Sequence, residues 1–159
     1  MAYLFTCEQE IDLDRIPFPH YKPKNEYVIG LEIKSSPKSQ NKMQDALLSK
    51  YPILKDKSYF LFLSRVDYKK GIDLLIEAFA TTVKTNFENV SDIPLLVIAA
   101  PGLNTTYGKT IQTVVNSDEK LLPKIVFTGM ITGDIKWGSL YGCEAFILPS
   151  HQENFGIAK

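Results

Sequence analysis

Cysteine is scarce in this 159-residue chain, and its two copies, Cys7 and Cys143, lie far apart. Two cysteines are too few for a disulfide framework, and their spacing is not that of a metal site. The composition therefore excludes a small secreted domain held together by disulfides. A reducing, cytoplasmic location is what we expect from it.

Long apolar runs and an excess of charge of either sign are also missing. No segment reaches the roughly 18 consecutive apolar residues of a membrane-spanning helix, and the chain does not begin with the basic stretch of a signal peptide. The 18 basic and 18 acidic residues cancel, so no overall field attracts nucleic acid or an anionic membrane. We expect no nucleic-acid partner and no transmembrane segment, and any anion site must be local.

The chain does have the size and apolar content of one globular domain, with a different segment in front of it. Hydrophobic residues make up 45% and charged residues 23% of the sequence, which is the usual globular range. Residues 1–38 contain four prolines and few regular signals, which indicates an extended or wrapped path. We interpret residues 1–38 as an arm or inter-domain connection, with a short strand at Tyr27–Leu31, and residues 39–159 as the main domain.

From Ser39 onward, continuous apolar runs alternate with stretches in which apolar residues repeat every three or four positions. Such runs are typical of strands covered on both faces, and such repeats are typical of helices with one buried side. The predicted helices are Ser39–Tyr51, Gly71–Phe87, Tyr107–Asn116 and Asp134–Cys143, and the predicted strands are Tyr59–Leu63, Leu95–Ala99, Lys124–Thr128 and Ala145–Leu148. The alternation predicts the α/β class, a parallel sheet with helices on both faces. Sheets of this kind bind ligands at the carboxyl ends of their strands.

Two cationic side chains follow the first of these strands. Arg65 leaves the strand end, and Lys70 stands just before the next helix. A planar guanidinium and a mobile ammonium close together suit a diphosphate. In the alternative interpretation, Lys69 and Lys70 are solvated charges and Arg65 pairs with Asp67. The loop alone leaves both interpretations open.

The other strand ends carry small or polar residues. Gly129 follows the third strand, where an ordinary turn with Asp134 as the cap of the next helix is the simpler interpretation. The fourth strand leads through Pro149 to His151 and Glu153. Because the carboxyl ends of parallel strands meet at one edge, we expect Glu153 on the same edge as the two cations. His151 is given no catalytic role.

Three stretches resemble the C-terminal domain of retaining glycosyltransferases of the GT-B fold, in the group-one family. They are Ser64–Gly71 before Ile72–Phe79, Phe127–Gly129, and Leu148–Ser150 with Glu153–Ile157. The likeness is strong over residues 58–159. More weakly, residues 1–38 resemble the end of the N-terminal domain and the crossing into the second. In that family two Rossmann-like domains face each other, and the C-terminal one holds a nucleotide-sugar donor.

The resemblance implies a role for each matching position. Arg65 and Lys70 would neutralise the donor diphosphate, in place of a metal ion, and Glu153 would hold hydroxyl groups of the transferred sugar. The backbone would contact the nucleobase at Thr128, Gly129 and Met130, and would donate N–H groups to sugar and phosphate at Asn154, Phe155, Gly156 and Ile157. The resemblance implies a nucleotide-diphosphate sugar as donor substrate and no further cofactor.

The sequence also departs from the family pattern. The second glutamate of the family's Glu-x7-Glu motif would fall eight residues after Glu153, and the sequence ends six residues after it. We interpret the chain as a piece of a hexosyltransferase-type enzyme, in which a missing N-terminal domain binds a sugar, lipid or protein acceptor.

Two functions stay open at this point. The chain is the donor-binding part of a retaining glycosyltransferase, or it is a nucleotide-binding module without catalytic activity. We expect the isolated chain to be inactive, because half a cleft does not position two substrates. A nicotinamide or flavin enzyme is disfavoured, because no Gly-x-Gly-x-x-Gly follows a predicted strand.

Overall fold

The structure, a computed structural model, describes residues 3–5, 11–12, 25–29, 35–85 and 92–151. The chain divides into two compact units, Met1–Ser36 and Pro37–Lys159. In the first unit, strand β1 (Tyr3–Phe5) pairs in parallel with β2 (Glu26–Val28). Strand β2 overlaps the strand predicted from Tyr27, and Gly30 and Leu31 lie outside the described residues.

The second unit contains a four-stranded sheet in the order β5-β4-β3-β6, in which every pair is parallel. The strands are β3 (Tyr59–Leu63), β4 (Leu95–Ala99), β5 (Ile125–Phe127) and β6 (Ala145–Phe146). Strand β6 ends two residues before the predicted end, Leu148, although the Ile147 N–H still donates to the Leu61 carbonyl at 2.8 Å. Pro149, which has no N–H, prevents the ladder from continuing.

Four α-helices of the second unit lie close to their predicted positions. They are α2 (Gln40–Lys50), α3 (Ile72–Thr85), α4 (Thr106–Asn116) and α5 (Gly133–Gly142), with short 3-10 helices η1 (Pro52–Leu54), η2 (Tyr68–Lys70) and η4 (Leu122–Lys124). The predicted cap of α5 is wrong, because Thr132 occupies that position and Asp134 lies in the first turn. There the Asp134 carboxylate lies 3.4 Å from the Lys42 ammonium.

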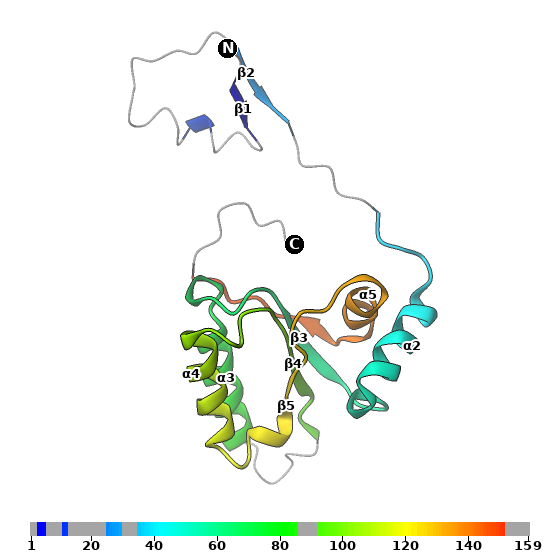
Figure 1. The fold of residues 1–159 in the computed structure, drawn as a ribbon, viewed down its shortest axis with the longest axis vertical. Coiled ribbons are helices and arrows are strands. Elements are labelled where there is room, and N and C mark those ends of the chain that lie inside the picture. The colour runs from blue at the N-terminus through cyan, green and yellow to red at the C-terminus, as the bar shows by residue number, and fades with distance from the viewer. Residues whose placement is uncertain (1–2, 6–10, 13–24, 30–34, 86–91, 152–159) are drawn as a thin grey trace. The chain divides into compact units, whose positions relative to one another are not determined.

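Two apolar cores flank the sheet, one on each face. Alternate side chains of a strand point to opposite faces, so β3 and β4 supply residues to both cores. Helices α3 and α4 cover one face and α2 and α5 the other (Figure 1). The first core includes Phe62, Leu96, Ile98, Ile72, Phe79, Ile111 and Val115, and the second includes Leu61, Leu95, Val97, Leu47 and Leu54. The structure confirms the predicted fold class, a Rossmann-like parallel sheet with helices on both faces.

Candidate functional site at the carboxyl edge of the sheet

The loops that follow the four parallel strands lie at one edge of the sheet. From β3 the chain passes through α3 to β4 on one side, whereas β6 lies on the other side of β3. The strand order therefore reverses beside β3, and open α/β sheets bind ligands outside the carboxyl ends of their strands at such a point. The loops after β3 and β6 lie at this point.

The loop after β3 is a short, internally bonded turn. The Asp67 carboxylate accepts a hydrogen bond from the Lys69 N–H at 2.9 Å, and the Asp67 carbonyl accepts one from the Lys70 N–H, also at 2.9 Å. The Val66 N–H donates to the Pro101 carbonyl at 2.9 Å, which ties the turn to the loop after β4. Arg65 thus stands at the start of a fixed turn and Lys70 at its end.

The Asp67 carboxylate caps η2 rather than neutralising Arg65. Within the described part of the chain no ion pair joins these two side chains, and Arg65 is exposed. The alternative in which Asp67 pairs with Arg65 is therefore not what the structure has. The guanidinium is available to an anion at the carboxyl edge.

The loops after β3 and β6 touch at Gly71. Gly71 adopts a left-handed conformation, with φ 66° and ψ 27°. A Cβ atom at this position would lie 1.9 Å from the Pro149 carbonyl oxygen. Only glycine fits both the dihedral angles and the contact. The contact places Lys70 next to the chain segment that leads toward Glu153.

His151 lies against residues from η2 and α3. Its ring stacks on the Tyr68 ring, with centroids 4.6 Å apart and planes 17° apart. Its Nε2 atom lies 3.4 Å from Oδ1 of Asp73, in the first turn of α3. The Tyr107 ring meets Tyr68 edge-on, at a centroid distance of 6.5 Å. Together these residues form a cluster beside the Gly71 contact, which we call the His151 cluster (Tyr68, Asp73, Tyr107 and His151).

Sequence reasoning missed this cluster. It gave His151 no role and did not single out its three partners. The one available signal was position, because each of the four residues lies within a few positions of the end of a predicted strand or the start of a predicted helix on the same edge. Nothing in the sequence indicates that His151 contacts Asp73 rather than solvent.

Three polar atoms in and beside the cluster are shielded from solvent. Asp73 Oδ1, the Tyr107 hydroxyl and Ser150 Oγ make no hydrogen bond of good geometry to a described residue, although the Tyr107 hydroxyl lies within reach of Asp73. Burial, followed by the negative charge of nearby Asp73, raises the pKa of Tyr107 to about 12. Tyr107 is therefore a neutral hydroxyl at physiological pH, held beside a carboxylate.

The loop after β5 carries the three residues predicted to contact a nucleobase. The Thr128 N–H donates to the Ile98 carbonyl at 3.1 Å, and the Thr128 carbonyl accepts from the Tyr51 hydroxyl at 3.1 Å. Gly129 has φ 69°, and apart from Gly129 and its chain neighbours no atom of the described residues lies within 4 Å of the place where its Cβ would be. The Met130 residue is 68% exposed. This loop is anchored at its start and open to solvent beyond it.

The structure thus brings five predicted site residues, Arg65, Lys70, Thr128, Gly129 and Met130, to loops at one edge of the sheet. The other five, Glu153, Asn154, Phe155, Gly156 and Ile157, lie outside the described residues. Two strand spacings separate β5 from β3, which corresponds to about 10 Å.

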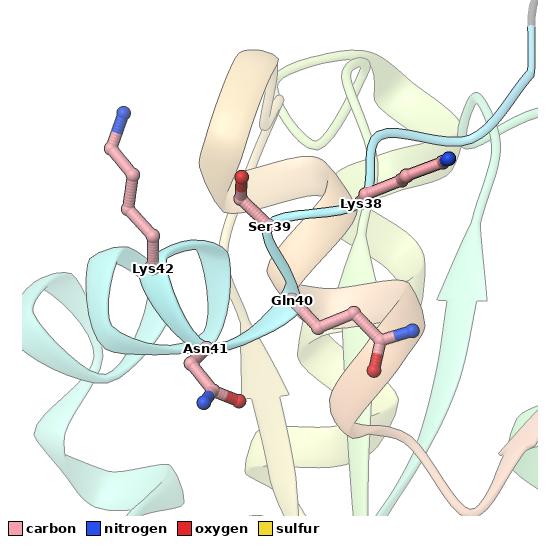
Figure 2. Close-up of a pocket in the computed structure, with 5 residues that line it drawn as sticks. All are labelled: Lys38, Ser39, Gln40, Asn41 and Lys42. Atoms are coloured by element: carbon pink, nitrogen blue, oxygen red, sulfur yellow. The ribbon is translucent and has the colours of Figure 1, made fainter.

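A pocket of about 370 Å³ lies at the start of α2 and is lined by Lys38, Ser39, Gln40, Asn41 and Lys42. Figure 2 shows that these side chains point in different directions rather than toward one point. A second pocket, of about 380 Å³, is lined by Ser58 and Tyr59 at the start of β3 and therefore lies at the opposite edge of the sheet. The polar groups of the first pocket do not converge, and the second pocket lies away from the carboxyl edge.

Two kinds of feature are absent from the described part of the chain. No group of three or more His, Cys, Asp or Glu side chains could hold a metal ion there. No described helix is long and apolar enough to cross a membrane.

The fold is that of a Rossmann-like α/β domain, with cationic and glycine-containing loops at the carboxyl edge of its sheet. The chain belongs to the family described as "Glycosyl transferases group 1", whose profile matches residues 43–159. This finding confirms the family indicated by the sequence motifs.

Among solved structures the chain is similar to a sucrose-phosphate synthase from Thermosynechococcus elongatus, with 19% sequence identity and a TM-score of 0.64. The match covers 98% of this chain and 36% of that protein, so the chain spans about a third of its length. At this identity the likeness shows the fold. No curated protein sequence matches the chain.

Proposed function

We propose that the second unit is the donor-binding part of a retaining, hexosyltransferase-type glycosyltransferase of the GT-B fold, as its C-terminal domain. Membership of the group-one family supports glycosyl transfer. The observation that carries the donor assignment is the fixed turn that presents Arg65 and Lys70 where the strand order reverses.

The two cations suit the chemistry of a nucleotide-diphosphate sugar. When the bond between the sugar and the diphosphate breaks, negative charge grows on the leaving phosphate, and cations fixed beforehand stabilise that charge. Arg65 would make paired contacts with phosphate oxygens, and Lys70 would add a point charge. We propose that these side chains do this work without a metal ion.

The rest of the donor would extend along the carboxyl edge. The nucleobase would lie against Thr128, Gly129 and Met130, and the separation of about 10 Å between β5 and β3 leaves room for a ribose between base and diphosphate. Glu153 would accept hydrogen bonds from sugar hydroxyls, and the Asn154–Ile157 backbone would donate to sugar and phosphate. The acceptor, a sugar, lipid or protein, would bind to a second domain facing this edge.

For the 159-residue chain by itself, we propose binding of the donor without turnover. Positioning two substrates contributes up to about 7–11 kcal/mol to catalysis, and one domain positions only the donor. Incubation of the chain with UDP-glucose, ADP-glucose and GDP-mannose tests this point. Release of nucleotide faster than in buffer would contradict it and would favour a complete active site.

The donor assignment is tested by titrating UDP, GDP and ADP into the chain and into Lys70→Ala. Charge-assisted hydrogen bonds contribute about 1.5–3 kcal/mol, so the dissociation constant of the bound diphosphate should rise about 10- to 100-fold. Lys69→Ala is the matched control, because Lys69 belongs to the same short helix and is exposed. It should change the constant less than about twofold. Equal effects of the two substitutions, or no binding of any diphosphate, would contradict the assignment.

A further inference from the structure

We infer that Tyr51 is a positioning residue for nucleobase recognition. Its hydroxyl group fixes the start of the loop after β5 (residues 128–132), where the proposed function places the base. The inference deepens the proposed function and rests on it in one respect, since it takes this loop to contact the base of the donor. The fixing of the loop is a property of the free protein.

Tyr51 is itself held by backbone hydrogen bonds and by an apolar core. It follows the last residue of α2, where its N–H donates to the Leu47 carbonyl at 2.8 Å and its carbonyl accepts from the Leu54 N–H at 3.0 Å. Its ring packs, partly buried, against the second core, which contains both leucines. A tyrosine side chain has only two rotatable angles, so a packed ring leaves its hydroxyl group little choice of position.

The Tyr51 hydroxyl group donates to the carbonyl of Thr128, the first residue of the loop, at 3.1 Å. On its other side, the Thr128 N–H donates to the Ile98 carbonyl, at the end of β4, also at 3.1 Å. Thr128 is therefore bonded both to the sheet and to the segment that follows α2. The first residue of the loop is fixed from two directions.

The far side of the loop is anchored in the same core. Ile131 is 6% exposed and belongs to the second core, whereas Met130 just before it is 68% exposed. Thr128 and Ile131 are thus fixed points, and Gly129 and Met130 are the two residues between them. Among the described residues, only Gly129 and its chain neighbours come within 4 Å of the place of a Gly129 Cβ, which leaves room for a base to approach the backbone.

The hydrogen bond from Tyr51 also sets the direction of the next peptide group. A trans peptide is planar, so its carbonyl and its N–H point in opposite directions, and the described residues contain no cis peptide bond. Because the Thr128 carbonyl faces Tyr51, the Gly129 N–H faces away from it. The Thr128 hydroxyl group in turn donates to the Gly129 carbonyl at 3.1 Å, so the Met130 N–H faces away from the Thr128 side chain.

Two N–H groups directed in this way suit the acceptor atoms on the edge of a base. Every common base carries a carbonyl oxygen or a ring nitrogen that accepts a hydrogen bond. Tyr51 holds the first of the two N–H groups in direction without touching the base itself. Loss of its hydroxyl group should therefore weaken the binding of a nucleoside diphosphate more than the binding of inorganic pyrophosphate, which has no base.

The test uses the full 159-residue chain with Tyr51→Phe, which keeps the ring in the core and removes only the hydroxyl group. Tyr59→Phe is the matched control, because the Tyr59 hydroxyl group also donates to a backbone carbonyl, that of Ser139, at 2.9 Å. Tyr59 belongs to the same core, but its bond leads to α5 rather than to the loop after β5.

The first readout is the hydrogen exchange of the Thr128 amide in the free protein, followed by NMR. This N–H is protected by its bond to the Ile98 carbonyl, and the Tyr51 bond opposes the local opening that exposes it. Tyr51→Phe should speed the exchange about threefold to tenfold relative to Tyr59→Phe, the effect of one lost hydrogen bond. Equal exchange rates in the two variants would overturn the positioning, whether or not nucleotides bind.

The second readout is the ratio of two affinities, one for UDP, GDP or ADP and one for inorganic pyrophosphate, the latter measured by displacement of the nucleotide. For the nucleotide that the wild type binds most tightly, Tyr51→Phe should lower this ratio about threefold to tenfold, and Tyr59→Phe should change it less than about twofold. An unchanged ratio together with faster exchange would overturn the role in base recognition. If the wild type binds none of the three nucleotides, the proposed function and the base role both fail, and the exchange result still decides the positioning of the loop.

Discussion

Two buried tyrosine hydroxyls of this protein differ in the quality of their hydrogen bonds. The Tyr59 hydroxyl donates to the Ser139 carbonyl at 2.9 Å, and that carbonyl is among the last four of α5, which lack partners within the helix. Burial, followed by the charge of Cys143, raises the pKa of Tyr59. The Tyr107 hydroxyl makes no hydrogen bond of good geometry to a described residue, although it lies beside the Asp73 carboxylate.

Replacing each tyrosine with phenylalanine should therefore affect stability to different extents. Tyr59→Phe leaves the Ser139 carbonyl unpaired and should lower the free energy of unfolding by about 1 kcal/mol, whereas Tyr107→Phe removes a hydroxyl without a well-formed hydrogen bond and should change it less. Urea unfolding of the two variants and the wild type measures both effects. A greater loss in Tyr107→Phe would show that its hydroxyl makes a stabilising hydrogen bond after all.

Gly71 and Gly129 have nearly the same positive φ but different surroundings. Alanine substitutions at the two positions therefore distinguish the cost of the backbone conformation from the cost of a steric contact. Gly71 has φ 66° and touches the Pro149 carbonyl, whereas Gly129 has φ 69° and open space around it. Gly129→Ala should cost about 1–2 kcal/mol of stability, the price of the conformation alone. Gly71→Ala should cost about 1–3 kcal/mol more, because the added methyl group displaces the loop after β6.

Urea unfolding of the two glycine variants gives both costs, and titration with the diphosphate probes shows whether the displaced loop alters the site. Gly71→Ala should also weaken binding of any diphosphate that the wild type binds, because Gly71 follows Lys70 directly. Equal losses of stability in the two variants would mean that Pro149 moves away from Gly71 without cost.

At the level of secondary-structure elements, α2 and α5 are in close backbone contact at Gly138. A Cβ atom there would lie 2.1 Å from the Met43 carbonyl oxygen. Helix propensity alone predicts that Gly138→Ala stabilises the protein by about 1 kcal/mol. The close contact between α2 and α5 predicts the reverse, a loss of about 1–3 kcal/mol of stability, because the added methyl group has to push the two helix backbones apart.

Thr81→Ala is the control for this substitution. Thr81 lies on the exposed side of α3, so alanine there improves helix propensity without a steric contact and should raise stability by a few tenths of a kcal/mol. Thermal unfolding followed by circular dichroism compares the two variants. A higher midpoint for Gly138→Ala than for the wild type would show that the helices separate easily.

The elements themselves were predictable, and their contacts were not. Apolar runs and three-to-four repeats identify β3, β4 and the helices, because burial on one or two faces leaves a local trace in the sequence. The order of strands and helices likewise predicts that Arg65 and Lys70 follow β3 at the carboxyl edge, where the structure has them, and their binding of a diphosphate stays a prediction. The contacts of Gly71 with Pro149, and of His151 with Asp73, join segments far apart in the sequence and leave no such trace. Asp134 was assigned as a cap because the residue type suits that position, but the backbone places Thr132 there.

At the scale of the whole molecule, both apolar cores lie within the second unit. Their described residues run from Leu47 to Leu148, and Tyr141 of α5 donates a hydrogen bond to the Pro37 carbonyl at the start of that unit. The second unit therefore contains the interactions that hold its sheet and helices together. Its stability should depend on where a shortened chain begins.

A chain of residues 37–159 should unfold in one cooperative transition, with a free energy within about 1 kcal/mol of that of the 159-residue chain, because its cores are intact. A chain that begins at Gln40 lacks the Pro37 carbonyl and places a positive amino terminus at the start of α2, where the helix dipole disfavours it. It should lose about 1–2 kcal/mol. Urea unfolding of the three chains separates these effects. A large loss of unfolding free energy on removing residues 1–36 alone would show that the first unit stabilises the second. Equal stability of the two shortened chains would show that the Tyr141 hydrogen bond contributes nothing.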